Sequence, residues 1–128
     1  WYREKIRLDL GMAAMAIKIE PRIEEAAKNN SMVVLDGLYS WEEYLYLKQK
    51  FPQIKLLCIY APVSLRYQRL SVRKVRPLNL QEARDRDIAE IEHLNKGGPI
   101  AVSDYLIVND TDEDSFLAQL DSLYKTLV

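Results

Sequence analysis

Residues 55–62, KLLCIYAP, decide the predicted fold. The part 55–60 is a short apolar run without alternation of polar and apolar residues, which indicates a strand covered on both faces, as in a parallel sheet. Ala61-Pro62 then turns the chain into a helix, since proline is tolerated in the first helical turn. Two more runs of this kind, 32–36 and 104–109, alternate with amphipathic segments. We therefore expect an α/β fold, a three-layer sandwich around a parallel sheet.

Periodicity and capping signals place the helices. Apolar residues recur at three-to-four spacing over 2–28, and Gly11 and Pro21 are expected to break this stretch into pieces. Capping boxes and apolar spacing predict four further helices. One runs from Ser40, capped with Glu43, to about Lys50, one follows Pro62, and one covers about 113–127. The fourth begins at Asn79 with Glu82 and stops at 96–99, and its apolar face is Leu80, Ala83, Ile88, Ile91 and Leu94.

The composition is that of an ordinary globular protein, and it excludes several functional classes. The 128 residues are 48% hydrophobic and 29% charged with a net charge of −1, which fits a single domain over 1–128. A near-neutral charge gives no bias towards nucleic acid or a membrane surface. No apolar run approaches the ~20 residues of a membrane helix. The single cysteine, Cys58, allows no internal disulfide and fits a reducing cytoplasm.

Asp36 is the first candidate for chemistry, because it ends the apolar run 32–36. In open parallel sheets, ligands bind beyond the carboxyl ends of the strands. An acid in that place can hold Mg²⁺ or its water during phosphoryl transfer. The alternative is a turn residue that caps the following loop.

A basic stretch is the second candidate. Between 61 and 81 the sequence carries five cations and no acid: Arg66, Arg69, Arg73, Lys74 and Arg76. On a helix, spacings of three and four put the first three arginines on one narrow stripe. Guanidinium groups match phosphate oxygens, and the segment of about 66–80 could form a lid over a transferring phosphate. The alternative is a solvated basic face with ordinary surface pairs.

The remaining polar candidates are weaker. Arg86 either completes a phosphate clamp or simply pairs with Glu90 four residues later. His93 lies off the apolar face and, with no second histidine and no cysteine cluster, supports no zinc site.

Four motifs follow one another along nearly the whole chain: VVLDGL (33–38), IYAP running into RYQRL (59–70), RDIAEI (86–91) and IAVSDYLIVN (100–109). Their order resembles the dephospho-CoA kinase and adenylate kinase-related branch of the P-loop kinases. The resemblance implies a P-loop NTPase-like fold, with Asp36 near the metal and the phosphates. It also implies that the lid arginines Arg66, Arg69, Arg73 and Arg76 face the nucleotide phosphates. Arg86 would be the downstream arginine of the phosphate clamp, and Asn109 would end the strand near the base.

Two departures from that family stand out. Relatives often carry arginine where this chain has Tyr39, and no G-x-x-x-x-G-K-S/T motif occurs in the sequence. That loop supplies the backbone N–H groups and the lysine that hold the β- and γ-phosphates. The chain begins at Trp1 and not at Met, so we expect a piece of a longer protein that lacks the N-terminal P-loop strand and helix.

The expected function is therefore part of an ATP- and Mg²⁺-dependent kinase for a nucleotide, a nucleoside or a coenzyme precursor, with the piece alone inactive. The alternative is a non-catalytic nucleotide-binding or regulatory module that keeps the kinase fold. A small-molecule nucleotide is the expected partner, with no nucleic acid and no membrane. We also expect the piece to need its N-terminal segment, and it could form oligomers.

Overall fold

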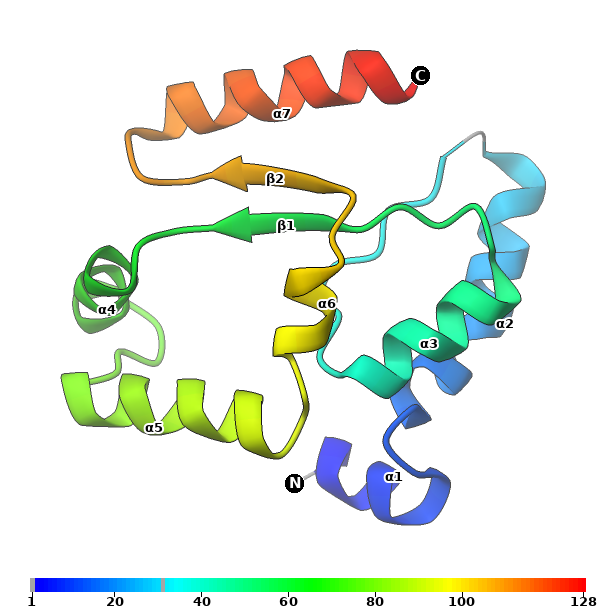
Figure 1. The fold of residues 1–128 in the computed structure, drawn as a ribbon, viewed down its shortest axis with the longest axis horizontal. Helices are drawn as coiled ribbons and strands as arrows, with labels where there is room; N and C mark the ends of the chain where they lie inside the picture. Colours follow the sequence, from blue (N-terminus) through cyan, green and yellow to red (C-terminus); the bar gives the residue numbers. More distant parts are fainter. Residues whose placement is uncertain (1, 31) are drawn as a thin grey trace. The chain divides into compact units, whose positions relative to one another are not determined.

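The computed structural model describes residues 2–30 and 32–128. The chain forms two compact units, each made from two stretches of sequence. The first unit comprises Trp1–Ile54 and Ala89–Val102, and the second comprises Lys55–Ile88 and Ser103–Val128. Figure 1 shows the helices and strands of both units.

The first unit is helical. It contains α1 (Tyr2–Leu10), α2 (Ala14–Asn29), α3 (Trp41–Lys50) and the short α6 (Gly97–Ala101). Helix α2 packs against α1 and α3, and α3 also contacts α6. Ala16 and Ile23 of α2 and Leu47 of α3 form the buried core of this unit.

The predicted break at Gly11 is confirmed, whereas the break at Pro21 is wrong. Gly11 lies between α1 and α2 with a φ of +82°, a conformation that glycine adopts at little cost. Pro21 lies inside α2, where it removes one helical hydrogen bond. The helix continues through it because Ala14, Ala16 and Ile23 on either side are buried and hold both halves in place.

Helix α3 begins as its capping signal predicts. The Ser40 hydroxyl oxygen accepts a hydrogen bond from the Glu43 amide at 3.1 Å, and the helix ends at Lys50. The Glu43 carboxylate accepts from the Tyr39 amide at 3.0 Å, one residue before the usual position in a capping box. The Ser40 hydroxyl also donates to the Met12 carbonyl, which ties the start of α3 to the turn before α2.

The second unit holds a small parallel sheet. Strand β1 (Leu57–Tyr60) pairs in parallel with β2 (Tyr105–Val108), and Leu57 lies opposite Tyr105. Helix α4 (Val63–Val72) follows β1, and α7 (Glu113–Leu127) contacts β2. Helix α5 (Leu80–Glu92) begins in this unit and ends in the first. A capping box between Asn79 and Glu82 starts it, as predicted.

The third predicted strand, 32–36, is wrong for this structure. These residues have no regular secondary structure, and the sheet found in the described part of the chain has two strands. A strand exists only through ladder hydrogen bonds to a neighbour, and an apolar run without one stays irregular. Val34 is 81% exposed, so the segment is not covered on both faces.

Two other expectations differ from the structure. Residues 96–99 do not stop a long helix: α5 ends at Glu92, Asn95 has a φ of +51°, and α6 begins at Gly97. The predicted apolar face of α5 is largely exposed, with Leu80 at 66% and Ile91 at 62%.

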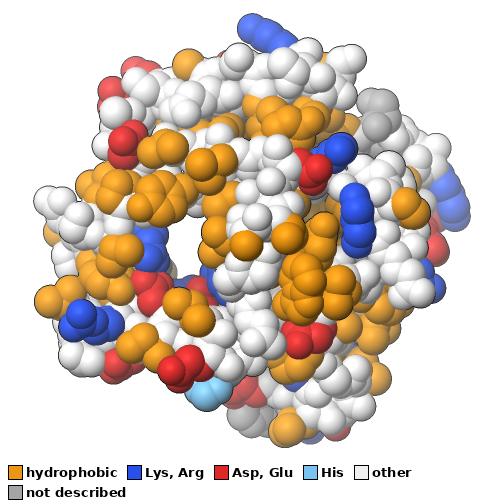
Figure 2. Space-filling view, in the orientation of Figure 1, with side chains coloured by type: hydrophobic (Ala, Val, Ile, Leu, Met, Phe, Trp, Pro, Cys, Tyr) orange, Lys and Arg blue, Asp and Glu red, His pale blue; other side chains and the backbone are white. Residues whose placement is uncertain are grey.

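The sheet is not covered on both faces by helices. Side chains alternate between the two faces of a strand, so Tyr60 and Leu106 share a face. They are 46% and 60% exposed. Many hydrophobic side chains are likewise visible on the surface in Figure 2. The fold is thus a mixed α/β arrangement with a two-stranded parallel sheet and seven helices in the described residues. Over 2–30 and 32–128, no helix combines the length and the apolar character needed to cross a membrane.

Candidate functional site

A hollow of about 430 Å³ lies in the second unit, and its lining contains two of the sequence-predicted residues, Arg69 and Asn109. Its other lining residues are Thr111, Glu113 and Phe116. We call this the Arg69 hollow. Asn109 directly follows β2, and its amide donates to the Tyr60 carbonyl at 2.7 Å, which extends the ladder by one bond. The hollow therefore lies at the carboxyl edge of the parallel pair, where ligands bind in open α/β sheets.

Arg69 anchors the loop that follows β2. Its Nη1 donates to the Asn109 carbonyl at 2.8 Å and to Asn109 Oδ1 at 3.1 Å, and its Nη2 donates to the Thr111 carbonyl at 3.1 Å. All three acceptors are neutral, and no ion pair to Arg69 occurs within the described residues. The positive charge of the guanidinium is thus not compensated by a paired carboxylate, and the three hydrogen bonds fix the position of the group.

Asp112 fixes the helix that forms another wall of the hollow. It is the N-cap of α7, and its carboxylate accepts from the Ser115 amide at 2.8 Å and from the Ser115 hydroxyl at 3.2 Å. These hydrogen bonds, the backbone one first, lower the pKa of Asp112 below its ordinary value of 3.8. The capping signal Asp112 to Ser115 was not used in the sequence prediction, although the type of residue reveals it.

The start of α7 is expected to lose stability in acid. A lowered folded-state pKa means that the cap contributes fully above pH 3.8 and that the contribution is lost as the pH falls through the folded value. The chemical shift of the Ser115 amide, followed by NMR from pH 6 to about 2, measures this loss. Asp112→Asn is the matched control, because asparagine caps helices without titrating in this range. A Ser115 shift that titrates equally in both proteins would contradict the assignment.

Arg66 lies on α4 but is engaged elsewhere. Its Nη1 and Nη2 donate to the two carboxylate oxygens of Asp87 at 2.9 and 2.7 Å, and the Tyr67 hydroxyl donates to the same carboxylate at 2.9 Å. This hydrogen bond raises the pKa of Tyr67. The bidentate pair ties α4 to the middle of α5 and compensates the charge of Arg66. A pairing across 21 residues leaves no local signal in the sequence.

Arg73 and Arg76 lie in the predicted lid segment. Arg73 follows the last residue of α4, and its Nε donates to the Arg76 carbonyl. Arg76 has a φ of +50° directly before Pro77, a conformation that is costly for a residue with a side chain. Arg86 is exposed on α5. Only Arg69 of the predicted arginines lines the hollow beside Asn109.

Asp36 belongs to the first unit and is exposed in the irregular segment before α3. In the described residues, no group of three or more histidine, cysteine, aspartate or glutamate side chains could hold a metal ion. Mg²⁺ often binds through one or two carboxylates and the phosphates of its nucleotide. A single carboxylate such as Asp36 fits an ion that arrives with a nucleotide.

Tyr39 packs over the turn after Asp36. Gly37 has a φ of +86°, a conformation that favours glycine, and a Cβ added there would lie 2.8 Å from the Tyr39 ring. The Lys96 ammonium lies 5.7 Å from the centre of the same ring.

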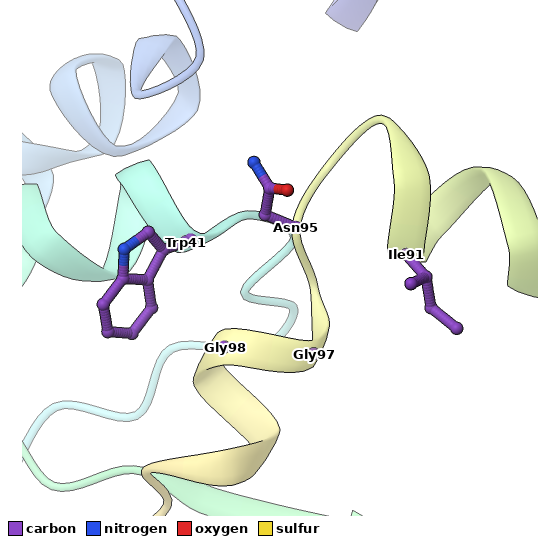
Figure 3. Close-up of a pocket in the computed structure, with 5 residues that line it drawn as sticks. All are labelled: Trp41, Ile91, Asn95, Gly97 and Gly98. Atoms are coloured by element: carbon purple, nitrogen blue, oxygen red, sulfur yellow. The ribbon is translucent and has the colours of Figure 1, made fainter.

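A second hollow, of about 380 Å³, lies in the first unit. Trp41, Ile91, Asn95, Gly97 and Gly98 line it. Figure 3 shows Trp41 on α3, Ile91 on α5 and Asn95 on the loop between α5 and α6. The Asn95 side chain in its lining donates to Glu42 Oε1 at 3.2 Å. No sequence-predicted site residue lines this hollow.

The comparisons with known proteins give a consistent group of relatives. No family model matches the chain. A UPF0200 protein of Pyrococcus abyssi is 33% identical over 97% of this chain and 68% of its own length. One of Sulfurisphaera tokodaii is 30% identical over 99% of this chain and 70% of its own length, and one of Thermococcus onnurineus is 27% identical over 97% and 69%. These names state no activity.

Proposed function

We infer that this chain, which belongs to the UPF0200 protein family, is part of an ATP-dependent kinase that phosphorylates a small molecule. The observation that carries this inference is the pinning of Arg69 to Asn109 at the carboxyl edge of the parallel strands. Arg69 was expected on the lid helix and Asn109 at the strand end near the nucleotide base, and their contact supports a nucleotide site at this edge. The P-loop NTPase-like fold belongs to the same proposal.

The Arg69 hollow is suited to a nucleotide base. A guanidinium whose donors are held in its own plane presents a charged face, and flat aromatic groups stack on such faces. Phe116, half-buried in the same lining, adds an apolar surface. Arg73 and Arg76 continue the basic segment beyond α4, where they would neutralise phosphates.

Phosphoryl transfer asks for positioning and charge neutralisation more than for covalent chemistry. In the proposed kinase, Mg²⁺ that is bound to ATP would supply charge neutralisation, and Asp36 would hold that ion or one of its waters. Arg86 would complete the phosphate clamp. The acceptor would be a nucleotide, a nucleoside or a coenzyme precursor, and the reaction would take place in the cytoplasm.

The second candidate is a nucleotide-binding module without catalysis. Tyr39 in place of an arginine favours it, because the ring fills space over Gly37 where a cationic acceptor contact would otherwise lie. Both proposed functions include ATP binding, so an assay of phosphoryl transfer distinguishes the kinase from the non-catalytic module.

Arg73→Ala is expected to weaken ATP binding by about 1.5–3 kcal/mol, the usual loss for a hydrogen bond to a charged group. Arg69→Ala is expected to weaken it by about 0.5–2 kcal/mol, because the base loses the guanidinium face on which it stacks. Isothermal titration with ATP and Mg²⁺ measures the effect. Arg22→Ala, an exposed arginine of α2, is the matched control because it removes the same charge. Arg69→Ala also frees the loop 109–111, so Arg73→Ala, which leaves that loop intact, is read separately. If both variants bind ATP with unchanged affinity and show normal circular dichroism, the arginines only form a solvated basic surface and do not bind the nucleotide.

A further inference from the structure

Two polar groups in the lining of the Arg69 hollow have no partner among the described residues. Arg69 Nη1 donates to Asn109 Oδ1, so the Asn109 Nδ2 amine is turned away from the guanidinium and offers two N–H donors. The Glu113 carboxylate lines the same hollow and makes no hydrogen bond or ion pair in the described part of the chain. The lining of the hollow thus contains both an available donor, Asn109 Nδ2, and an available acceptor, the Glu113 carboxylate.

The charges around the hollow disfavour a phosphate in it. Asp110, Asp112, Glu113 and Asp114 lie in sequence around the start of α7, and Arg69 is the one cation among the lining residues of the hollow. A bound anion would be repelled by these carboxylates. An uncharged flat ring avoids that repulsion and uses the guanidinium face and the Phe116 ring.

We propose that Glu113 is a specificity-determining residue: its carboxylate accepts a hydrogen bond from the exocyclic amino group of a purine base in the Arg69 hollow. Asn109 Nδ2 donates to a ring nitrogen or carbonyl oxygen of the same base. This inference rests on the proposed nucleotide-binding function. Adenine carries an amino donor beside ring acceptors, and guanine carries an amino donor beside its N1–H and O6. Hypoxanthine lacks the amino group, so the shared chemistry is an aminopurine.

The first experiment compares ATP, GTP and ITP on the 128-residue chain by isothermal titration. ITP differs from GTP by the loss of the 2-amino group, and from ATP by the exchange of the 6-amino group for a carbonyl. The ITP affinity is expected to be at least about ten-fold lower than that of the preferred nucleotide, as for one lost hydrogen bond to a charged acceptor. If the chain prefers ATP, the 6-amino group of adenine is the donor to Glu113. If it prefers GTP, the 2-amino group of guanine is the donor. Equal affinity for all three would overturn the proposal.

The second experiment removes the acceptor. Glu113→Ala is expected to reduce the ratio of preferred-nucleotide affinity to ITP affinity to about one. Asp114→Ala is the matched control, since it removes the same charge from the same helical turn and should keep the ratio. Removing an acidic side chain from the protein raises the affinity for every triphosphate, and this common gain cancels in the ratio of two affinities. A ratio that survives in Glu113→Ala would sink the inference alone. A chain that binds no triphosphate at all would instead remove the proposed function on which the inference rests.

Discussion

Glu43→Ala is expected to destabilise the first unit by about 3–5 kcal/mol, the usual cost of removing one partner of a buried ion pair. Glu43 is 2% exposed, and its carboxylate accepts from the Tyr39 amide at 3.0 Å and from Arg7 Nη2 at 3.5 Å. The substitution leaves the Arg7 guanidinium, whose side chain is 13% exposed, without its counterion. Total domain stability is only about 5–15 kcal/mol, so this loss approaches global unfolding.

Urea unfolding followed by tryptophan fluorescence measures this effect, since Trp41 is the first residue of α3. Glu25→Ala is the control: its pair with Lys28 has both side chains 68% exposed, and exposed pairs contribute at most about 1 kcal/mol. The double variant Arg7→Leu with Glu43→Leu is expected to recover part of the loss, because neither charge is then left buried alone. An equal cost for Glu43→Ala and Glu25→Ala would show that the buried pair is not special.

The elements that the sequence predicted well depend on local signals. Ser40 and Asn79 each cap their helix through the amide of the glutamate three residues later. The Asn79 box is complete, whereas the Glu43 carboxylate bonds the amide of Tyr39 one residue before Ser40. Residues 113–127 form a helix over the predicted range, and 57–60 and 105–108 pair in parallel. A cap or an apolar run depends on a few neighbouring residues, so it can be recognised without knowledge of the tertiary structure.

The errors arise where a distant partner decides the outcome. Residues 32–36 have strand-like composition but no strand beside them, and Pro21 is tolerated because buried residues hold both halves of α2. Glu43 was recognised as a cap, yet its burial beside Arg7 depends on packing across 36 residues. Tertiary context overrides local preference in each of these places.

The candidate site was predicted in part. Arg69 and Asn109 were each proposed for nucleotide binding, and the structure brings them together. Glu113 and Phe116 were missed, because they appeared only as members of an amphipathic helix. The signal that could have found Glu113 is its place directly after the N-cap, next to the strand end that already held Asn109.

The 128-residue chain by itself is expected to show no phosphoryl transfer and to self-associate. The chemical reason is that the sequence contains no G-x-x-x-x-G-K-S/T loop, so Arg69 and Arg73 can attract ATP but cannot orient its γ-phosphate. The physical reason lies in the sheet. A two-stranded sheet is marginally stable at best, and free strand edges pair with other chains.

Leu106→Lys tests the physical half of this expectation. Leu106 is 60% exposed on β2, which is an edge strand of the two-stranded sheet, so a lysine there should disfavour pairing of this edge with another chain. Leu8→Lys is the control, since Leu8 is 87% exposed on α1, a helix of the first unit, whereas both strands belong to the second. Sedimentation velocity across a range of concentrations should show a larger monomer fraction for Leu106→Lys and no change for Leu8→Lys. A chain that is already monomeric and melts cooperatively above about 45 °C would contradict the expected self-association. ATP-dependent phosphorylation of any nucleotide by the purified chain would contradict the expected lack of phosphoryl transfer.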